Sequence, residues 1–408
     1  MAVLSCVLAA ACAAGPSATS TSAEPQRATV PRNSRQVAEK PLVTLPSTAP
    51  GSASWTPWPA ALHDSRHSGA STATGPKTGT VRWRRKLEGA VTAGPVIGQD
   101  GTIYAASNGG VLHALDAATG ADRWTYDSGH TDGGDLSISP LVLPDRTVLW
   151  PTPAAELVAL SPTGTPLWSQ PLPGQPTSPA SVDGHRIYVG DLSGAVNALD
   201  VMGASGHRLV WTVHVGSVSY GSVVTDGTGR LYTTADTALI AIDDRGGVGT
   251  VAWRADPHDD ITEVSAGLAG DGTALLGTNG GREWAYHRDG RPAWNAPRII
   301  TYSSPAVTAS GLAYVGDHAG RVHVFDIGNG SEATTYRVGP GQIWSSTVVD
   351  RTYRLYFASQ DGHVFGVDSG GTLLFDLNLD APIDSYPALS ADGALIIGAR
   401  NGILTSVG

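Results

Sequence analysis

Aromatic and acidic residues recur at similar spacing through the second half of this chain, and their side chains could bind a ligand. They are Tyr220, Glu263, Tyr302, Trp344 and Asp384, separated by steps of 43, 39, 42 and 40 residues. Aromatic faces hold sugars by stacking and cations by cation–π attraction, and carboxylates accept hydrogen bonds from hydroxyl groups. If the fold gathers these residues round an axis, they predict a site for a sugar or a cation. The alternative interpretation is that the rings fill a narrow channel and the carboxylates solvate its mouth.

Other kinds of chemistry have little support in the sequence. The motifs G-x-S-x-G and H-E-x-x-H and the calcium loop D-x-[DN]-x-[DN]-G do not occur. Both cysteines lie in the first dozen residues, which excludes a catalytic cysteine or a cysteine metal site in the rest of the chain. His113, His323 and His363 fall on strand-like runs or beside glycine turns, where packing explains them. We therefore expect no catalytic and no metal-binding residues.

Residues 80–408 consist of a repeated unit whose first strands are 39 to 45 residues apart. After the first strand comes a second, such as "GTIYAAS" or "LAYVGD", then a glycine turn and a third, such as "LHALD" or "VHVFD". A fourth strand carries an aromatic residue. Four short antiparallel strands in a period of about 40 residues predict the blade of a β-propeller.

The number of units and the position of one extra strand predict how the ring closes. There are eight first strands, and the eighth unit reaches the C-terminus without a fourth strand. The segment "TVRWRRKLEG" precedes the first unit and can supply that strand, which would leave no free sheet edge at the closure. The sequence therefore predicts an all-β, eight-bladed propeller of four-stranded antiparallel blades, closed by an N-terminal strand.

The aromatic residue on the fourth strand of each unit, called the closing aromatic below, and the turns beside it are predicted to be structural. We expect the rings to lie between adjacent blades, where burial of an indole contributes several kcal/mol, about 5 by area. Asp116 can accept N–H bonds from its turn, and Gly120 can adopt a positive φ there. The predicted docking residues are Trp83, Trp124, Trp168, Trp211, Trp253, Trp294, Asp116 and Gly120.

The N-terminal 79 residues differ in composition from the repeats. Residues 1–12 form a short apolar run typical of an export signal, and "LAAAC" indicates a lipoprotein signal with lipidation at Cys12. The alternatives are a simple cleaved signal and a true start further upstream, since no Lys or Arg precedes the run. Residues 13–53 are predicted to be a disordered tether rich in Ser, Thr, Pro and Ala. Residues 54–79 are predicted to be a lead-in that packs on the ring.

The segment "ALDAATGADRW" fits the pattern A-x-D-x-x-T-G-x-x-x-W. It resembles the docking repeat of the PQQ-dependent quinoprotein dehydrogenases and of the wider PQQ-like eight-bladed propeller family. The lead-in "WPAALHDSRHSGAS" is similar to that of secreted members. For a dehydrogenase, the resemblance implies a vicinal Cys–Cys pair against the quinone and a Ca²⁺ held by Glu, Asn and Asp. This sequence has no cysteine after Cys12, so it is more similar to the non-catalytic branch, which includes the propeller lipoprotein of outer-membrane β-barrel assembly.

Taken together, these features predict a non-enzymatic exported propeller that acts as a scaffold or a protein- or ligand-binding module at the cell surface. The alternatives are a PQQ-dependent oxidoreductase and a glycan- or ligand-sensing module that uses the axial residues. The expected partner is an envelope or extracellular protein or glycan, with no cofactor and with membrane attachment only through the lipid. A net charge of −10 argues against nucleic acid, and a monomer is expected.

Overall fold

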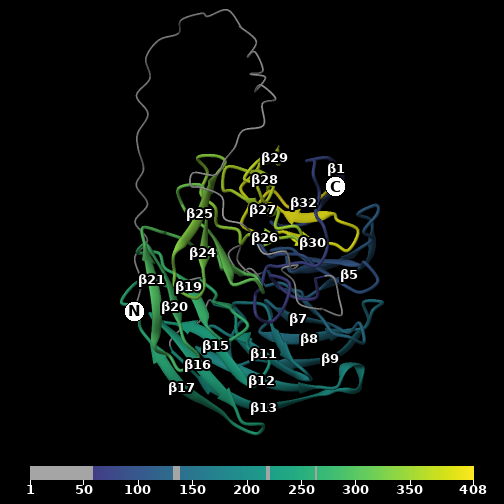
Figure 1. The fold of residues 1–408 in the computed structure, drawn as a ribbon. Helices are drawn as coiled ribbons and strands as arrows, with labels where there is room; N and C mark the ends of the chain where they lie inside the picture. The colour runs from purple at the N-terminus through teal and green to yellow at the C-terminus, as the bar shows by residue number, and fades with distance from the viewer. Residues whose placement is uncertain (1–57, 132–137, 217–220, 262–263) are drawn as a thin grey trace, which may run out of the picture. The chain divides into compact units, whose positions relative to one another are not determined.

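The computed structural model describes residues 58–131, 138–216, 221–261 and 264–408. It contains eight separate four-stranded sheets, and every paired neighbour within a sheet is antiparallel. Seven sheets use four consecutive strands, whereas the eighth has the order β1-β32-β31-β30. Figure 1 shows β1 beside the yellow β32, close to the C-terminus. This confirms the predicted eight-bladed propeller and its closure by an N-terminal strand.

The blades are numbered here in chain order by their first strands. Blade 1 is β2 (Val96–Ile97), β3 (Ile103–Ala106), β4 (Val111–Leu115) and β5 (Asp122–Asp127). Blade 2 is β6 (Leu141–Val142), β7 (Val148–Thr152), β8 (Glu156–Leu160) and β9 (Pro166–Pro171). Blade 3 is β10 (Ser181–Asp183), β11 (Arg186–Gly190), β12 (Ala195–Val201), the 3-10 turn η1 (Gly203–Ser205) and β13 (His207–His214). Blade 4 is β14 (Val224–Thr225), β15 (Arg230–Ala235), β16 (Ala238–Asp244) and β17 (Gly249–Ala255).

The second half of the ring follows the same order. Blade 5 is β18 (Gly267–Leu268), β19 (Ala274–Gly277), β20 (Arg282–Tyr286) and β21 (Pro292–Pro297). Blade 6 is β22 (Ala306–Val307), β23 (Leu312–Gly316), β24 (Arg321–Asp326) and β25 (Glu332–Arg337). Blade 7 is β26 (Val348–Val349), β27 (Leu355–Ala358), β28 (His363–Val367) and β29 (Leu373–Asn378). Blade 8 is β30 (Ala388–Leu389), β31 (Leu395–Gly398), β32 (Ile403–Val407) and β1 (Val81–Lys86).

The strands of a blade differ in burial according to their distance from the axis. First strands contact one another between blades 1 and 2, 3 and 4, 4 and 5, and 5 and 6, so they lie on the inner side of the ring. Second and third strands are almost wholly buried because both of their faces pack on neighbouring blades, and they are accordingly rich in Val, Ile, Leu and Ala. Fourth strands, such as β5, alternate between exposed and half-buried residues. The core is therefore the set of layers between blades.

In six blades the tryptophan of the fourth strand contacts the turn between the third and fourth strands of the next blade. Five indoles donate to a backbone carbonyl there, from Trp83 to Ala117, Trp124 to Pro162, Trp168 to Gly203, Trp253 to Arg288 and Trp294 to Ile327. Trp211 packs against Gly249, and its buried Nε1 has no hydrogen-bond partner among the described residues. Tyr336 and Phe375 occupy the fourth strands of blades 6 and 7.

The turn at Gly120 shows why this contact requires glycine. Gly120 has a φ of +69°, and a Cβ at this position would lie 2.6 Å from the Trp83 ring. Asp116 Oδ1 accepts bonds from the backbone N–H groups of Ala118 and Thr119, each at 3.1 Å, and so fixes the turn. The ring closure between β1 and blade 1 thus has the same docking geometry as the other blade contacts.

The lead-in from Trp58 onward runs along the inner strands of seven consecutive blades. Backbone N–H groups of the first-strand residues donate to it at 2.7 to 3.0 Å, from Ile97, Val142, Val182, Thr225, Leu268, Val307 and Val349. The acceptors are carbonyl groups between Trp58 and Gly69 and the hydroxyl of Ser65. This segment therefore links the first strands of seven blades by hydrogen bonds before the chain reaches β1.

Candidate functional site

Two kinds of loop meet at one end of each blade. One loop leads into the first strand, and the other is the turn between the second and third strands. In blades 6, 7 and 8 a backbone hydrogen bond joins them: His318 to Ile300 at 2.9 Å, Gln360 to Gln342 at 2.8 Å and Arg400 to Pro382 at 2.9 Å. This repeated bond fixes which side chains become neighbours.

Three aromatic rings come together at these loops. The centroid of Tyr302 lies 4.9 Å from that of His318 and 5.2 Å from that of Trp344, and His318 and Trp344 are 6.1 Å apart. The Tyr302 and Trp344 planes cross at 71°, an edge-to-face arrangement. All three side chains are partly exposed. Rings from blades 6 and 7 therefore form one accessible aromatic surface.

Polar side chains from blades 7 and 8 continue this surface. Asp384 accepts hydrogen bonds from the Gln360 amide and the Arg400 guanidinium, and Trp344 Nε1 donates to Gln342 Oε1 at 2.8 Å. The Asp384 side chain is 13% exposed and that of Arg400 is 44% exposed. The "axial cluster" below means Tyr302, His318, Gln342, Trp344, Gln360, Asp384 and Arg400.

The axial cluster includes three of the five ligand residues predicted from the sequence. Tyr302 and Trp344 are in contact, and Asp384 is in the adjacent blade. Tyr220 and Glu263 lie outside the described residues, as does Cys12, the predicted lipidation site. The sequence reasoning missed His318, Gln360 and Arg400, which occupy corresponding turns between second and third strands. An alignment of those turns between units, like the alignment of the first strands, would have identified these three residues from the sequence.

The His318 ring is polar but poorly solvated. Burial lowers its pKa, although the charge of Asp317 acts in the opposite direction. Its Nε2 is buried and has no hydrogen-bond partner among the described residues. The ring is therefore neutral at neutral pH and leaves one polar atom unsatisfied beside the aromatic surface.

Two other histidines are held between pairs of carboxylates. His323 contacts Asp317 at 3.0 Å and Glu332 at 2.8 Å, and His113 contacts Glu88 at 2.6 Å and Asp122 at 2.9 Å. Packing alone, the interpretation from sequence, does not describe these residues, because their ring nitrogens form specific polar contacts. Each histidine links the third strand to the fourth strand and to a loop through polar contacts, so both have a structural role.

The replacement of His323 by asparagine should destabilise the protein in a pH-dependent manner. Burial lowers the pKa of His323, but the hydrogen bonds and charges of Asp317 and Glu332 raise it more, so the net pKa is above 6.5. The stabilisation is therefore complete below pH 6.5 and is lost as pH rises through the folded-state pKa. Urea unfolding should show a loss of about 1–3 kcal/mol at pH 5.5 and a smaller loss at pH 9.

The matched control is His258→Asn, since the His258 side chain is 89% exposed and its replacement should leave the free energy of unfolding unchanged at both pH values. An equal loss for His323→Asn at pH 5.5 and pH 9 would contradict the assignment of a charged histidine.

A buried carboxyl lies just behind the axial cluster. Glu283 in β20 is fully buried, and neither of its side-chain oxygens has a hydrogen-bond partner among the described residues. Burial raises its pKa well above the usual 4.5. It pairs across the sheet with Gly277, where an added Cβ would lie 3.2 Å from Glu283 Oε2 and 2.2 Å from Thr301, the residue before Tyr302.

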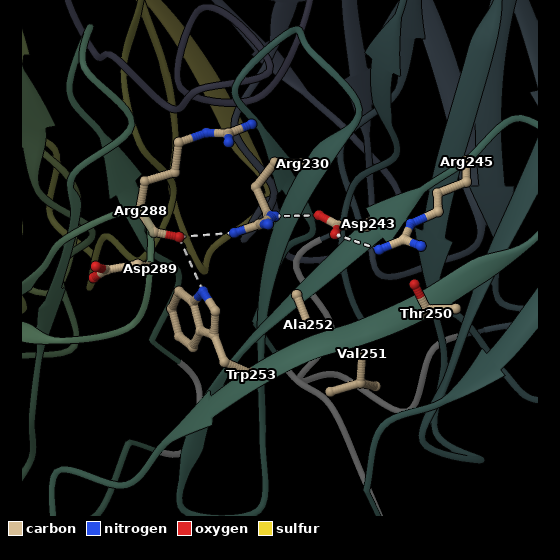
Figure 2. A pocket seen from close by; sticks show the side chains of 9 residues that line it. All are labelled: Arg230, Asp243, Arg245, Thr250, Val251, Ala252, Trp253, Arg288 and Asp289. Carbon is tan, nitrogen blue, oxygen red and sulfur yellow. Dashed lines mark hydrogen bonds and ion pairs between the residues drawn. The ribbon is translucent and has the colours of Figure 1, made fainter.

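The outer edge of blades 4 and 5 contains an open groove of about 640 Å³, shown in Figure 2. Most of its polar groups stabilise the blade contact. Arg230 contacts Asp243 and donates to the carbonyl of Arg288 at 2.7 Å, and the Trp253 indole donates to the same carbonyl at 3.0 Å. The Arg288 side chain pairs with Asp226 at 2.9 Å. We therefore interpret this groove as part of the blade docking geometry.

The described residues contain no group of three or more His, Cys, Asp or Glu side chains arranged to hold a metal ion. In the same part of the chain, none of the helical segments has the length and hydropathy needed to cross a membrane.

The fold and its docking turns define the class of PQQ-like repeat propellers. The family model described as "Outer membrane protein assembly factor BamB" matches residues 68–201, 153–298 and 202–407. These matches together cover most of the chain, so the chain belongs to this family. This confirms the resemblance identified in the sequence.

The individual proteins that this chain resembles share low sequence identity with it. The curated "Protein Rv3035" of Mycobacterium tuberculosis is 28% identical over 149 residues, which is 35% of each chain; the match therefore spans about a third of that relative. The crystal structure of BamB from Moraxella catarrhalis is 15% identical, with a TM-score of 0.64 over 80% of this chain and 98% of that one. The quinohemoprotein alcohol dehydrogenase from Comamonas testosteroni is 14% identical, with a TM-score of 0.67 over 87% and 81%. At these identities, the two structures show the fold alone.

Proposed function

We propose that this protein is a non-enzymatic, extracytoplasmic propeller that binds a component of the cell envelope through the axial cluster. The observation that carries the proposal is the convergence of Tyr302, His318 and Trp344 from two adjacent blades into one partly exposed surface. Partly exposed aromatic residues with polar neighbours are typical of binding surfaces. The propeller holds these loops in fixed positions, and family membership adds that relatives of the same fold include BamB.

The location outside the cytoplasm is supported by the N-terminal sequence. Residues 1–12 are typical of an export signal, and lipidation at Cys12 would attach the protein to a membrane. Residues 13–53 would then act as a tether between the lipid and the ring. A single lipid chain binds membranes only marginally, so a fully processed lipoprotein with several chains would be needed for stable attachment.

This chain lacks residues that a quinoprotein dehydrogenase would need. No cysteine follows Cys12, so the vicinal pair cannot form in the propeller. The described residues also contain no group of three or more His, Cys, Asp or Glu side chains placed to hold a metal ion. These residues do not fit PQQ and Ca²⁺, and we propose a binding function without a cofactor.

The double replacement Tyr302→Ala and Trp344→Ala should abolish retention of envelope material. The full chain, immobilised, is incubated with a solubilised envelope fraction, and the retained protein and carbohydrate are both quantified. We expect the wild type to retain material and the double variant to retain less than about a tenth of it, because loss of about 1.4 kcal/mol already gives a factor of ten.

The control is His207→Ala, which removes an aromatic contact on the outer edge, where His207 stacks on Trp168 at 4.2 Å. Equal retention by the wild type, the control and the double variant, with unfolding temperatures preserved, would overturn the proposed function.

A further inference from the structure

The axial cluster combines aromatic faces with hydrogen-bonding groups whose charges cancel. We propose that it binds a neutral carbohydrate, with the sugar ring stacked on Trp344 and Tyr302 and its hydroxyl groups bonded by Gln360, Asp384 and Arg400. This inference rests on the proposed function, because it assigns a ligand class to the same cluster.

The geometry of the rings suits a sugar. The Tyr302 and Trp344 planes cross at 71° with centroids 5.2 Å apart, so the two rings form a corner. The C–H face of a pyranose can stack on one ring while its edge contacts the other, which removes apolar surface of both from water. A flat aromatic ligand would contact only one of these faces well.

The polar groups beside the rings match the needs of hydroxyl groups. Gln360 Nε2 donates to the Ile383 carbonyl at 3.0 Å and to Asp384, and its Oε1 has no partner among the described residues. Arg400 bonds Asp384 through Nε, and within the described ranges its two terminal amino groups have no partner. A hydroxyl both donates and accepts, so it can bridge such an acceptor and such a donor.

His318 adds an independent observation at the same place. Its Nε2 is shielded from solvent, and the described part of the chain offers it no hydrogen-bond partner, although the ring lies beside both Tyr302 and Trp344. Buried polar atoms in native proteins are normally satisfied, by protein, water or ligand. A hydroxyl of a sugar on the aromatic surface would supply the missing partner.

The charge balance distinguishes a neutral ligand from a charged one. A cation-binding aromatic site gains from an uncompensated carboxylate, but the carboxylate of Asp384 is already paired with Arg400. An anion would need a free cation, but Arg400 is compensated by Asp384 and His318 is neutral. The net charge of −10 opposes anions further.

The lead-in limits the direction from which a ligand can approach. It bonds Val307, five residues after Tyr302, and Val349, five residues after Trp344. Five residues span at most about 16 Å, so the lead-in contacts the first strands β22 and β26 and not the loops that carry Tyr302 and Trp344. A ligand that approached along the inner strands would meet the lead-in, so approach from the loop side is favoured, which suits the end or a branch of a glycan.

The test is titration of the full chain with neutral hexasaccharides (maltohexaose, cellohexaose, xylohexaose, mannohexaose and chitohexaose), with hexagalacturonate and acetylcholine as charged probes. We expect at least one neutral sugar to shift tryptophan fluorescence and to give a measurable Kd by calorimetry. Trp344→Ala should raise that Kd at least tenfold and Gln360→Ala several-fold, whereas His207→Ala should not change it.

Binding of charged probes alone, or a sugar Kd that Trp344→Ala leaves unchanged, would overturn the inference. Periodate treatment of the envelope fraction separates this outcome from failure of the proposed function, because it destroys vicinal diols. If retention depends on Tyr302 and Trp344 but survives periodate and no hexasaccharide binds, the binding function stands and the carbohydrate assignment fails. If a sugar binds at the cluster but envelope retention does not depend on it, the proposed envelope role fails and the carbohydrate site stands.

Discussion

Replacement of Glu283 by leucine should stabilise the protein at neutral pH by roughly 2 kcal/mol or more, because burying an unbonded polar group costs that much. Glu283 is the only ionisable member of a position that repeats in all eight blades. Cross-strand pairing aligns it with Leu112, Leu157, Val196, Leu239, Val322, Val364 and Leu404, and all eight side chains are fully buried.

The effect should depend on pH in a defined direction. Burial raises the pKa of Glu283 well above 4.5, so the carboxyl stays neutral to a higher pH in the folded protein than in the unfolded chain. The folded state therefore loses about 1.4 kcal/mol of stability for each pH unit above 4.5, until the pH reaches the folded-state pKa. The advantage of Glu283→Leu should be smallest near pH 4 and should grow toward pH 7.

Urea unfolding of the wild type and the variant at pH 4, 5.5 and 7 measures this. Glu283→Gln is the matched control, because it removes the ionisation and keeps an unbonded polar group. We expect Glu283→Gln to remove the contribution of Glu283 to the pH dependence of the free energy of unfolding, and to stabilise the protein less than Glu283→Leu does. A variant with leucine that is less stable than the wild type at pH 7 would show that Glu283 has a partner of its own.

Replacement of Trp83 by alanine should destabilise the protein by about 3–5 kcal/mol, the usual cost of removing a buried indole. Trp83 lies on β1, is 8% exposed, donates to Ala117 at 2.8 Å and packs on Gly120. It is the docking residue at the contact where the two ends of the propeller meet. β1 is far in sequence from the other strands of its blade and joins them through its pairing with β32, and Trp83 then docks this closed blade on blade 1.

The measurement is thermal and urea unfolding of Trp83→Ala beside Arg84→Ala, since Arg84 is exposed on the same strand. The arginine variant should unfold like the wild type. Gly120→Ala should also destabilise, because it combines a positive φ with a clash against the Trp83 ring. Similar stabilities for Trp83→Ala and Arg84→Ala would show that the closure does not depend on the indole.

The architecture was predictable because local sequence patterns that repeat along the chain specify it. Alternating apolar runs, glycine turns and one aromatic residue per unit recur eight times, so an error in one unit is outweighed by the others. The missing fourth strand at the C-terminus and the strand around Trp83 predicted the closure. Each of these signals lies within a few residues of the element that it specifies.

The candidate site was only partly predictable. Tyr302, Trp344 and Asp384 were found because they hold the same position relative to the first strand of their units. His318, Gln360 and Arg400 belong to a different turn, about 16 residues further along, and only the closed blade places that turn beside the loop. Contacts between residues that are distant in sequence depend on strand register, and the register cannot be read directly from the sequence.

The sequence alone determined the fold class, the number of blades, the closure and the aromatic docking residues, because hydrophobic periodicity and turn chemistry act locally. The tertiary structure decided the charges and contacts: the histidine between two carboxylates at His323, the unpaired acid at Glu283 and the cancelled charges of Asp384 and Arg400. These depend on burial and on distances between loops of different blades, which exist only once the ring has closed.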